Sequence, residues 1–272
     1  MSHTSQPAAS DAVVIEIGGM AIALHTQDTA FRELLENRYA GFIKSSGNPQ
    51  FEFDIELCEP RETTKADEDV QVKRYAGEWF FQRGDFHARW DPKARRGDIR
   101  QSRNPYAIDS VLRIVHTLFL ARQGGFLIHA ASSIRGGRAF LFAGVSGAGK
   151  TTISRLAPPD ATLLTDEISY VRCDGGEYRA CGTPFAGELA RVGENQSARL
   201  STLFLLEKGP ENRIETVATS EAIRLLLRNI LFFAEDAELV NLVFRSACEF
   251  VERVPVRRLI FVPDERVWEM IM

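Results

Sequence analysis

Apolar and polar residues alternate along much of the first third of the chain. The stretches with the periodicity of strands are residues 13–24, 51–57, 70–75, 78–82 and 86–90. Gly18-Gly19 divides the first stretch into two strands joined by a tight turn, and Asp28 can cap a short helix after it. We therefore expect residues 13–98 to form a small antiparallel α+β region, after a flexible N-terminus at residues 1–12.

The rest of the chain combines helical and strand periodicities. Residues 126–132 and 138–143 are largely apolar and are separated by Arg135-Gly136-Gly137, which predicts an antiparallel hairpin of buried strands. Other strands are expected at residues 162–165, 168–172, 178–181, 200–206 and 256–262, and helices at residues 106–121, 220–232, 237–252 and 265–270. The polar, basic residues 92–98 would suit a boundary, so we assign residues 99–272 to a separate α/β domain.

Composition and charge narrow the classes of function. The 272 residues are 44% hydrophobic and 26% charged, which is typical of one large or two modest globular domains. A formal net charge of -4 provides no overall positive field, so we expect no nucleic-acid partner. We find no signal peptide and no long apolar run, and we expect a cytoplasmic protein without a membrane partner. The four cysteines lack the spacing of a metal site or a disulfide framework.

One motif carries specific chemistry. Residues 144–151 read GVSGAGKT and match G-x-x-x-x-G-K-[ST] at every specified position, between a predicted strand and a predicted helix start. Such a loop directs backbone N–H groups at phosphate oxygens, while its lysine reaches the β- and γ-phosphates and its hydroxyl binds Mg²⁺. We therefore predict binding of ATP and Mg²⁺, with a ligand-free glycine turn as the competing interpretation. The residues assigned to the nucleotide are Gly144, Ser146, Gly147, Ala148, Gly149, Lys150, Thr151 and Thr152.

An acidic pair and a histidine accompany this loop. Asp166-Glu167 follows the apolar residues 163–165, and two carboxylates at a strand end can bind Mg²⁺ and accept a proton from an attacking hydroxyl. His129 lies on the strand that the hairpin pairs with the strand entering the loop. A lone histidine on an apolar strand is more often a hydrogen-bonded core residue than a catalyst. The antiparallel neighbour differs from common parallel P-loop folds, in which a crossover leads to the loop strand.

Together, residues 128–131 (IHAA), 144–151 and 164–167 (LTDE) resemble the kinase domain of HPr kinase/phosphorylase and its relatives. That fold is similar to the nucleotide-binding core of ATP-dependent phosphoenolpyruvate carboxykinase. The resemblance covers residues 124–262 and implies an α/β P-loop kinase domain with a mixed sheet. It also implies three catalytic residues, Asp166 as general base, His129 as its helper and Lys150 as a charge neutraliser. We expect Mg²⁺ to be held by Thr151 of the loop motif and by one of Asp166 or Glu167, and we assign Glu167 to the metal. The resemblance adds Glu188 as a third metal ligand, although Glu188 can equally be a solvated loop residue.

The activity implied by the resemblance is transfer of the ATP γ-phosphoryl group to a hydroxyl, a serine, of a protein or peptide acceptor. The glycine-rich signature of bifunctional family members is not found beyond Glu188, so neither HPr as acceptor nor a phosphorylase activity is implied. Two alternatives remain open, a nucleotide-dependent regulatory module with little catalysis and a small-molecule hydroxyl kinase. Homo-oligomerisation and the role of the N-terminal region also remain open.

Two further sets of residues favour structural roles. Arg191 and Arg199 follow Glu188 and could clamp a phosphate, although surface arginines are commoner. The apolar residues Leu225, Leu226, Ile230, Phe232 and Phe233 are more typical of core packing than of a binding groove.

Overall fold

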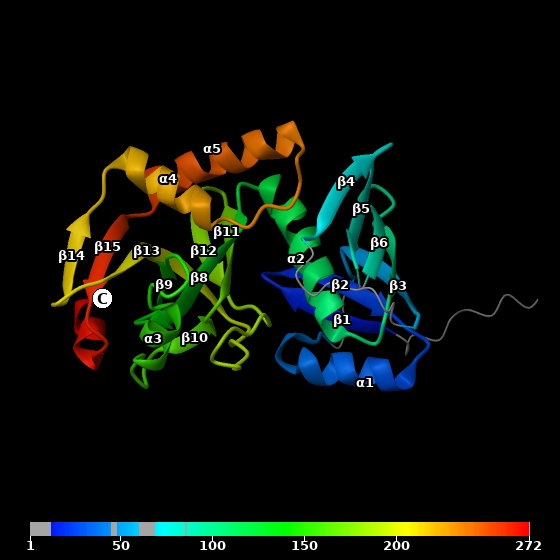
Figure 1. Cartoon of the computed structure of the whole chain (residues 1–272), viewed down its shortest axis with the longest axis horizontal. Helices are drawn as coiled ribbons and strands as arrows, with labels where there is room; N and C mark the ends of the chain where they lie inside the picture. Colours follow the sequence, from blue (N-terminus) through cyan, green and yellow to red (C-terminus); the bar gives the residue numbers. More distant parts are fainter. Residues whose placement is uncertain (1–11, 45–47, 60–68, 85, 272) are drawn as a thin grey trace, which may run out of the picture. The chain divides into compact units, whose positions relative to one another are not determined.

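The computed structural model describes residues 12–44, 48–59, 69–84 and 86–271 (Figure 1). The chain divides into two compact units, Met1–Val111 and Leu112–Met272. Each unit contains a mixed β-sheet accompanied by helices, so the α/β class predicted from the sequence is confirmed. Residue 98, where we placed the end of the N-terminal region, lies within a strand of the first unit. Residues 1–11 of the predicted flexible N-terminus lie outside the described residues.

The first unit is built on a seven-stranded sheet with the order β1-β2-β3-β7-β6-β5-β4. Its strands are β1 (Ala12–Ile17), β2 (Met20–His25), β3 (Phe51–Leu57), β4 (Gln71–Tyr75), β5 (Glu78–Arg83), β6 (Phe86–Asp91) and β7 (Arg96–Gln101). The helix α1 (Thr29–Arg38) and the 3-10 helix η1 (Ala40–Phe42) connect β2 to β3. Asp28 caps α1 as predicted, because its side chain accepts a hydrogen bond from the Phe31 amide at 2.8 Å.

The expectation of a wholly antiparallel sheet is wrong for this unit. β3 pairs in parallel with both β2 and β7, and α1 with η1 provides the crossover that parallel neighbours require. The basic stretch that suggested a boundary contains the start of β7, in which every second residue is buried. On the exposed face, Arg96 and Arg100 of β7 form ion pairs with Asp54 and Glu56 of β3 at 2.8 and 3.7 Å. Cross-strand charge pairs of this kind explain why a basic stretch forms an interior strand of the sheet.

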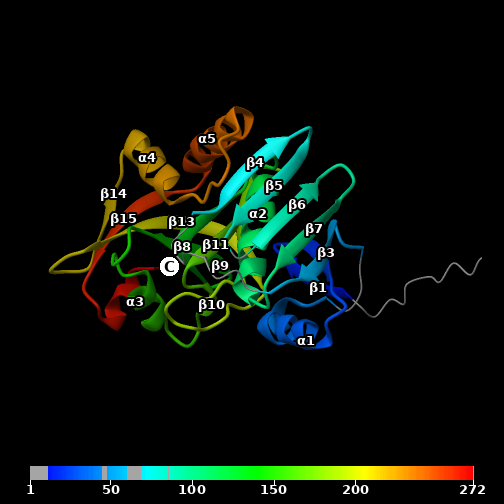
Figure 2. The ribbon, with the colours of Figure 1, turned by 45° about the vertical axis from the view of Figure 1, so that its right-hand side comes forward.

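The second unit contains an eight-stranded sheet with the order β10-β8-β11-β12-β13-β15-β14, in which β9 pairs with both β13 and β8. Its strands are β8 (Phe126–Arg135), β9 (Arg138–Ala143), β10 (Thr162–Thr165), β11 (Ile168–Asp174), β12 (Glu177–Cys181), β13 (Ser197–Lys208), β14 (Arg213–Thr216) and β15 (Val256–Phe261). Its helices are α3 (Lys150–Arg155), α4 (Thr219–Asn229), α5 (Ala237–Arg253) and the 3-10 helix η2 (Glu265–Met270), and α2 (Pro105–Ala121) spans the division between the units. α4 and α5 pack side by side (Figure 2).

Most elements predicted for this unit are present. The predicted hairpin is confirmed by the antiparallel pairing of β8 with β9. β13 pairs in parallel with β9 and β15, which makes the sheet mixed. The helix predicted at residues 220–232 ends at Asn229, because Ile230 leaves the helix to form a β-bridge with Ile128. The sequence does not predict β14, whose four residues lack an apolar alternation.

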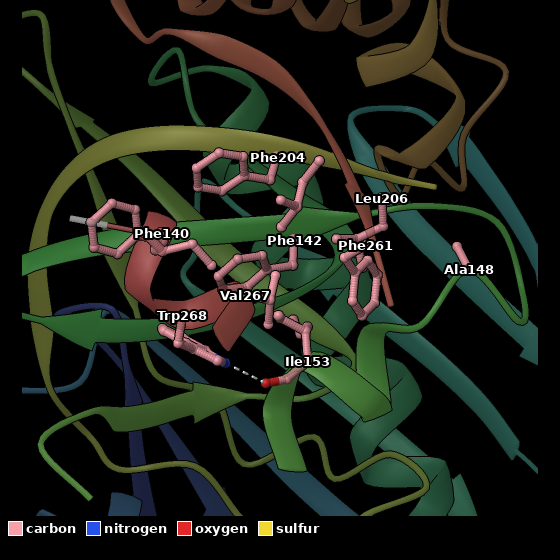
Figure 3. Packing of buried hydrophobic residues seen from close by; sticks show 12 residues of the cluster. Phe140, Phe142, Ala148, Ile153, Phe204, Leu206, Phe261, Val267 and Trp268 are labelled. Atoms are coloured by element: carbon pink, nitrogen blue, oxygen red, sulfur yellow. Dashed lines mark hydrogen bonds between the residues drawn. The ribbon is translucent and has the colours of Figure 1, made fainter. Parts of the chain in front are cut away.

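A cluster of apolar side chains supports the loop between β9 and α3 (Figure 3). The rings of Phe142 and Phe204 stack with their centroids 5.8 Å apart. Trp268 of η2 packs edge-on against Phe142 and donates its indole N–H to the carbonyl oxygen of Ile153 at 3.0 Å. η2 therefore helps to fix the position of α3.

Two other expectations concern the whole chain. No helix in the described part of the chain is both long and apolar enough to cross a membrane. All four cysteines, Cys58, Cys173, Cys181 and Cys248, are free.

Candidate functional site

Neighbouring strands bring the predicted functional residues together. β8 has β9 on one edge and β10 followed by β11 on the other. β11 begins at Ile168, which pairs with His129 of β8, so Asp166 and Glu167 lie immediately before this pair. On the opposite edge β9 ends at Ala143, and the chain enters residues 144–151, which we call the glycine loop. His129 therefore lies between the glycine loop and the acidic pair.

The glycine loop depends on backbone conformations that favour glycine. Gly147 and Gly149 have φ values of 77° and 111°. A Cβ at Gly149 would lie 2.7 Å from Cζ of Phe261, so the loop also packs too closely for a side chain there. The Lys150 ammonium donates hydrogen bonds to the carbonyl oxygens of Gly144 at 2.8 Å and Val145 at 3.3 Å. The loop thus curls around a lysine whose charge is available to an anion.

Asp166 is only 3% exposed, and the loop that follows β12 holds its carboxylate. Oδ1 accepts a hydrogen bond from the Gly187 amide and Oδ2 accepts one from the Leu189 amide, each at 2.9 Å. A Cβ at Gly187 would lie 2.9 Å from Asp166 Oδ2, so the absence of a side chain permits this approach. Glu188 lies between the two donors and is thereby fixed near the glycine loop.

Two side-chain oxygens meet beside the start of α3, and Glu167 lines the same cavity. The Thr151 hydroxyl donates a hydrogen bond to Glu188 Oε2 at 3.1 Å, and Glu167 Oε2 lies 4.0 Å from Nη2 of Arg113. Among the residues that the structure describes, no three histidine, cysteine, aspartate or glutamate side chains form a metal-binding group. A hydroxyl and a carboxylate in contact nevertheless suit Mg²⁺, which takes few protein oxygens and keeps water and phosphate as its other ligands.

The charges in the site influence one another. Burial lowers the pKa of Lys150, while the carboxylates of Glu167 and Glu188 act in the opposite direction. Partial burial lowers the pKa of His129, and the positive charges of Lys150 and Arg113 lower it further. These surroundings favour the neutral imidazole of His129, which can act through a hydrogen bond.

A cavity of about 1150 Å³ connects these groups. The predicted residues that line it are His129, Gly144, Ser146, Gly147, Gly149, Lys150, Thr151, Thr152, Asp166, Glu167 and Glu188. Ala148 does not line it, because its side chain belongs to the apolar cluster and its amide donates to the Val145 carbonyl at 3.0 Å. Arg191 and Arg199 do not line it either, and Arg199 lies 3.6 Å from Glu177 in an ion pair.

The sequence did not predict the residues of the other wall of the cavity. Besides Ala143, Val145, Ala186 and Gly187, it consists of Leu205, Leu206, Glu207, Lys208, Glu221, Leu225, Arg228, Asn229 and Arg258. Leu225 thus lines a cavity, whereas its neighbour Leu226 is buried in the core as expected. The signal in the sequence is the spacing of Glu221, Leu225, Arg228 and Asn229, which places polar and apolar residues together on one face of α4.

Comparisons with known proteins give one clear result. The Hpr(Ser) kinase/phosphatase from Coxiella burnetii is similar over 50% of this chain and 78% of its own, with 10% sequence identity and a TM-score of 0.28. A TM-score this low does not establish a common fold. No curated protein matches the chain. The model of one family, described as SynChlorMet cassette protein ScmC, matches residues 100–272. Because this match takes in more than half of the chain, including the glycine loop and the whole lining of the cavity, the chain belongs to the ScmC family.

Proposed function

We propose that this protein binds ATP with Mg²⁺ and transfers the γ-phosphoryl group to a hydroxyl of a protein or peptide acceptor. The observation that carries the proposal is that one cavity contains the glycine loop, the Thr151–Glu188 pair and the carboxylate of Asp166. Phosphoryl transfer depends mainly on positioning and charge stabilisation, and these groups supply both. The protein or peptide class of the acceptor, with serine as the reacting residue, rests on the resemblance to HPr kinase/phosphorylase.

The glycine loop and Lys150 are the proposed phosphate-binding groups. In the free protein the Lys150 ammonium is bound to two carbonyl oxygens of its own loop. Phosphate oxygens would replace these carbonyls as charged acceptors, and hydrogen bonds between charged groups are stronger than those to neutral carbonyls. Lys150 would thereby hold the β- and γ-phosphates and offset the negative charge that develops during transfer.

Thr151 and Glu188 are the residues that would hold Mg²⁺, with Glu167 nearby. The two side-chain oxygens lie 3.1 Å apart, which is close enough for both to bind one cation. When bound, Mg²⁺ would reduce the negative charge of the triphosphate.

Asp166 is the proposed general base. Two backbone amides orient its carboxylate, and each oxygen retains a further lone pair for the proton of the acceptor hydroxyl. The acceptor oxygen forms a bond to the γ-phosphorus as the bond to the β-phosphate oxygen breaks, and ADP leaves. Neutral His129 would support the acceptor hydroxyl or Asp166 through a hydrogen bond.

The test is incubation of the purified protein with γ-labelled ATP and an extract of its own cells, followed by identification of the labelled product. We expect Lys150→Ala to abolish labelling and Asp166→Asn to retain ATP binding while losing turnover on the order of 10²- to 10⁴-fold. Lys73→Ala, which removes an exposed lysine of β4, is the matched control and should label normally.

Two results would contradict the proposal. Unchanged labelling by Lys150→Ala would remove the glycine loop from the mechanism. Tight ATP binding by the wild-type protein without transfer to any peptide, protein or small hydroxyl compound would favour the regulatory module instead.

A further inference from the structure

The end of the cavity formed by α4 is not used by the proposed transfer. Glu221, Leu225, Arg228 and Asn229 line the cavity from this helix. Their spacing, over two turns, places them on the same face of α4. They lie across from the end of β13, which contributes residues 205–208 to the same cavity.

A β-bridge fixes this end of α4 beside the glycine loop. β9 pairs with β8 as far as Ala143, and Ile230 then pairs with Ile128 of β8. The bridge is extended by a hydrogen bond from the Leu231 amide to the Leu127 carbonyl at 2.9 Å. At these residues β11 pairs with the opposite edge of β8. Ile230 therefore pairs with the same edge of β8 as β9, just beyond the point where β9 ends. Asn229 therefore lies on the β9 edge, next to the start of the glycine loop.

The two ends of the cavity thus lie at opposite edges of β8. Asp166 and Glu167 precede β11 on one edge, whereas Asn229 precedes the bridge on the other. In the proposed reaction the γ-phosphate must face Asp166. A nucleotide whose phosphates follow the glycine loop would then direct its nucleoside toward α4.

The chemistry of the α4 end suits a nucleoside. Leu205 and Leu225 provide apolar surface. Arg258 is held between two carboxylates, with Glu221 Oε1 at 2.8 Å and Glu207 Oε2 at 3.5 Å. These carboxylates can accept hydrogen bonds from ribose hydroxyls without leaving an unpaired charge.

Asn229 is the polar group most suited to reading the base. Its side chain is nine-tenths buried, and Nδ2 donates one hydrogen bond to the Leu225 carbonyl at 2.8 Å. Within the described residues Oδ1 has no hydrogen-bond partner, and one N–H of the amide is also unused. An amide with one free acceptor and one free donor matches the 6-amino group and N7 of adenine. A 6-oxo purine would instead place its own acceptor oxygen opposite Oδ1, where no hydrogen bond can form.

We propose that the α4 end of the cavity is a nucleoside subsite that selects adenine through Asn229, with the base packed against Leu225. This inference rests on the proposed function, because the direction of the nucleotide follows from placing the γ-phosphate at Asp166. The volume of about 1150 Å³ exceeds the roughly 300–1,000 Å³ of ordinary ligand pockets, so a nucleotide here leaves room for an acceptor at the Asp166 end.

The test measures Kd by calorimetry, with Mg²⁺ present, for ATP, ITP and inorganic tripolyphosphate. ITP differs from ATP in carrying a 6-oxo group on the purine, and tripolyphosphate has no nucleoside. We expect the wild-type protein to bind ATP about tenfold more tightly than ITP, which is the effect of roughly one well-placed hydrogen bond. Asn229→Ala should reduce this ratio to about one and leave the Kd of tripolyphosphate unchanged. Asn241→Ala, on the exposed face of α5, is the matched control and should retain the ratio.

A second variant makes the result independent of the folding of Asn229→Ala. Leu225→Ala should weaken ATP and ITP binding equally, by about five- to tenfold, without affecting tripolyphosphate. Two outcomes would refute the nucleoside subsite while leaving the glycine loop assignment in place. One is equal Kd values of the wild-type protein for ATP and ITP. The other is unchanged Kd values for both nucleotides in both variants. If none of the three ligands binds, the proposed function fails and this inference fails with it.

Discussion

Replacing Asp166 by asparagine should loosen the loop that carries Glu188. The carboxylate of Asp166 accepts one hydrogen bond on each oxygen, from the amides of Gly187 and Leu189, both at 2.9 Å. Asparagine has nearly the same shape, but its NH₂ group cannot accept a hydrogen bond. One of the two backbone N–H groups would therefore face another donor in a position that is 3% exposed.

The magnitude follows from the charge and burial of this group. A hydrogen bond to a charged group contributes about 1.5–3 kcal/mol, and a neutral one about 0.5–1.5 kcal/mol. Asp166→Asn removes one charged hydrogen bond and converts the other to a neutral one, so we expect the free energy of unfolding to fall by about 2–4 kcal/mol. The control is Asp174→Asn, which affects a half-exposed ion pair with Arg172 and should cost less than about 1 kcal/mol.

The assays are urea unfolding and amide hydrogen exchange of a peptide that contains Gly187 and Leu189. Exchange in that peptide should accelerate in Asp166→Asn and remain slow in Asp174→Asn. Equal unfolding free energies for the two variants, together with unchanged exchange at both amides, would show that Asp166 does not hold this loop.

Two further predictions concern the second unit. Gly149→Ala should lower the free energy of unfolding by about 2–4 kcal/mol, because φ is 111° and the new Cβ would lie 2.7 Å from Phe261. Gly147→Ala, whose new Cβ would have no described atom within 4 Å, should cost at least about 1 kcal/mol less. Equal losses in urea unfolding would contradict the packing argument. Burial lowers the pKa of His116 from 6.5 to about 3, and neither ring nitrogen has a hydrogen-bond partner among the residues that the structure describes. Between pH 3 and pH 6.5 the unfolded chain binds a proton at His116 that the folded chain does not bind. The contribution of the neutral, buried imidazole to the free energy of unfolding is therefore complete above pH 6.5 and is lost as the pH falls toward 3. His116→Leu should therefore reduce the difference in unfolding free energy between pH 7 and pH 5 by about 2 kcal/mol, and an unchanged difference would refute this origin.

The sequence by itself determines the local parts of the site. The turn at Arg135-Gly136-Gly137 specifies the hairpin of β8 and β9, and the G-x-x-x-x-G-K-[ST] motif specifies the loop and the start of α3. These features depend on neighbouring residues, whose backbone preferences and apolar periodicity can be read directly. The same reading identifies Asp166-Glu167 as a pair at a strand end, because an apolar run leads into it.

Only the tertiary structure decided how distant segments meet. The parallel pairing of β3 with β2 and β7 replaced the antiparallel sheet expected from alternation, because periodicity shows which face is buried but not which strand is adjacent. The contact between Thr151 and Glu188 depends on the two amides that fix the intervening loop to Asp166. Asn229 lines the cavity because Ile230 pairs with Ile128 at a strand edge. Each of these contacts joins residues far apart in the chain, and their free energy arises only when the sheet brings them together.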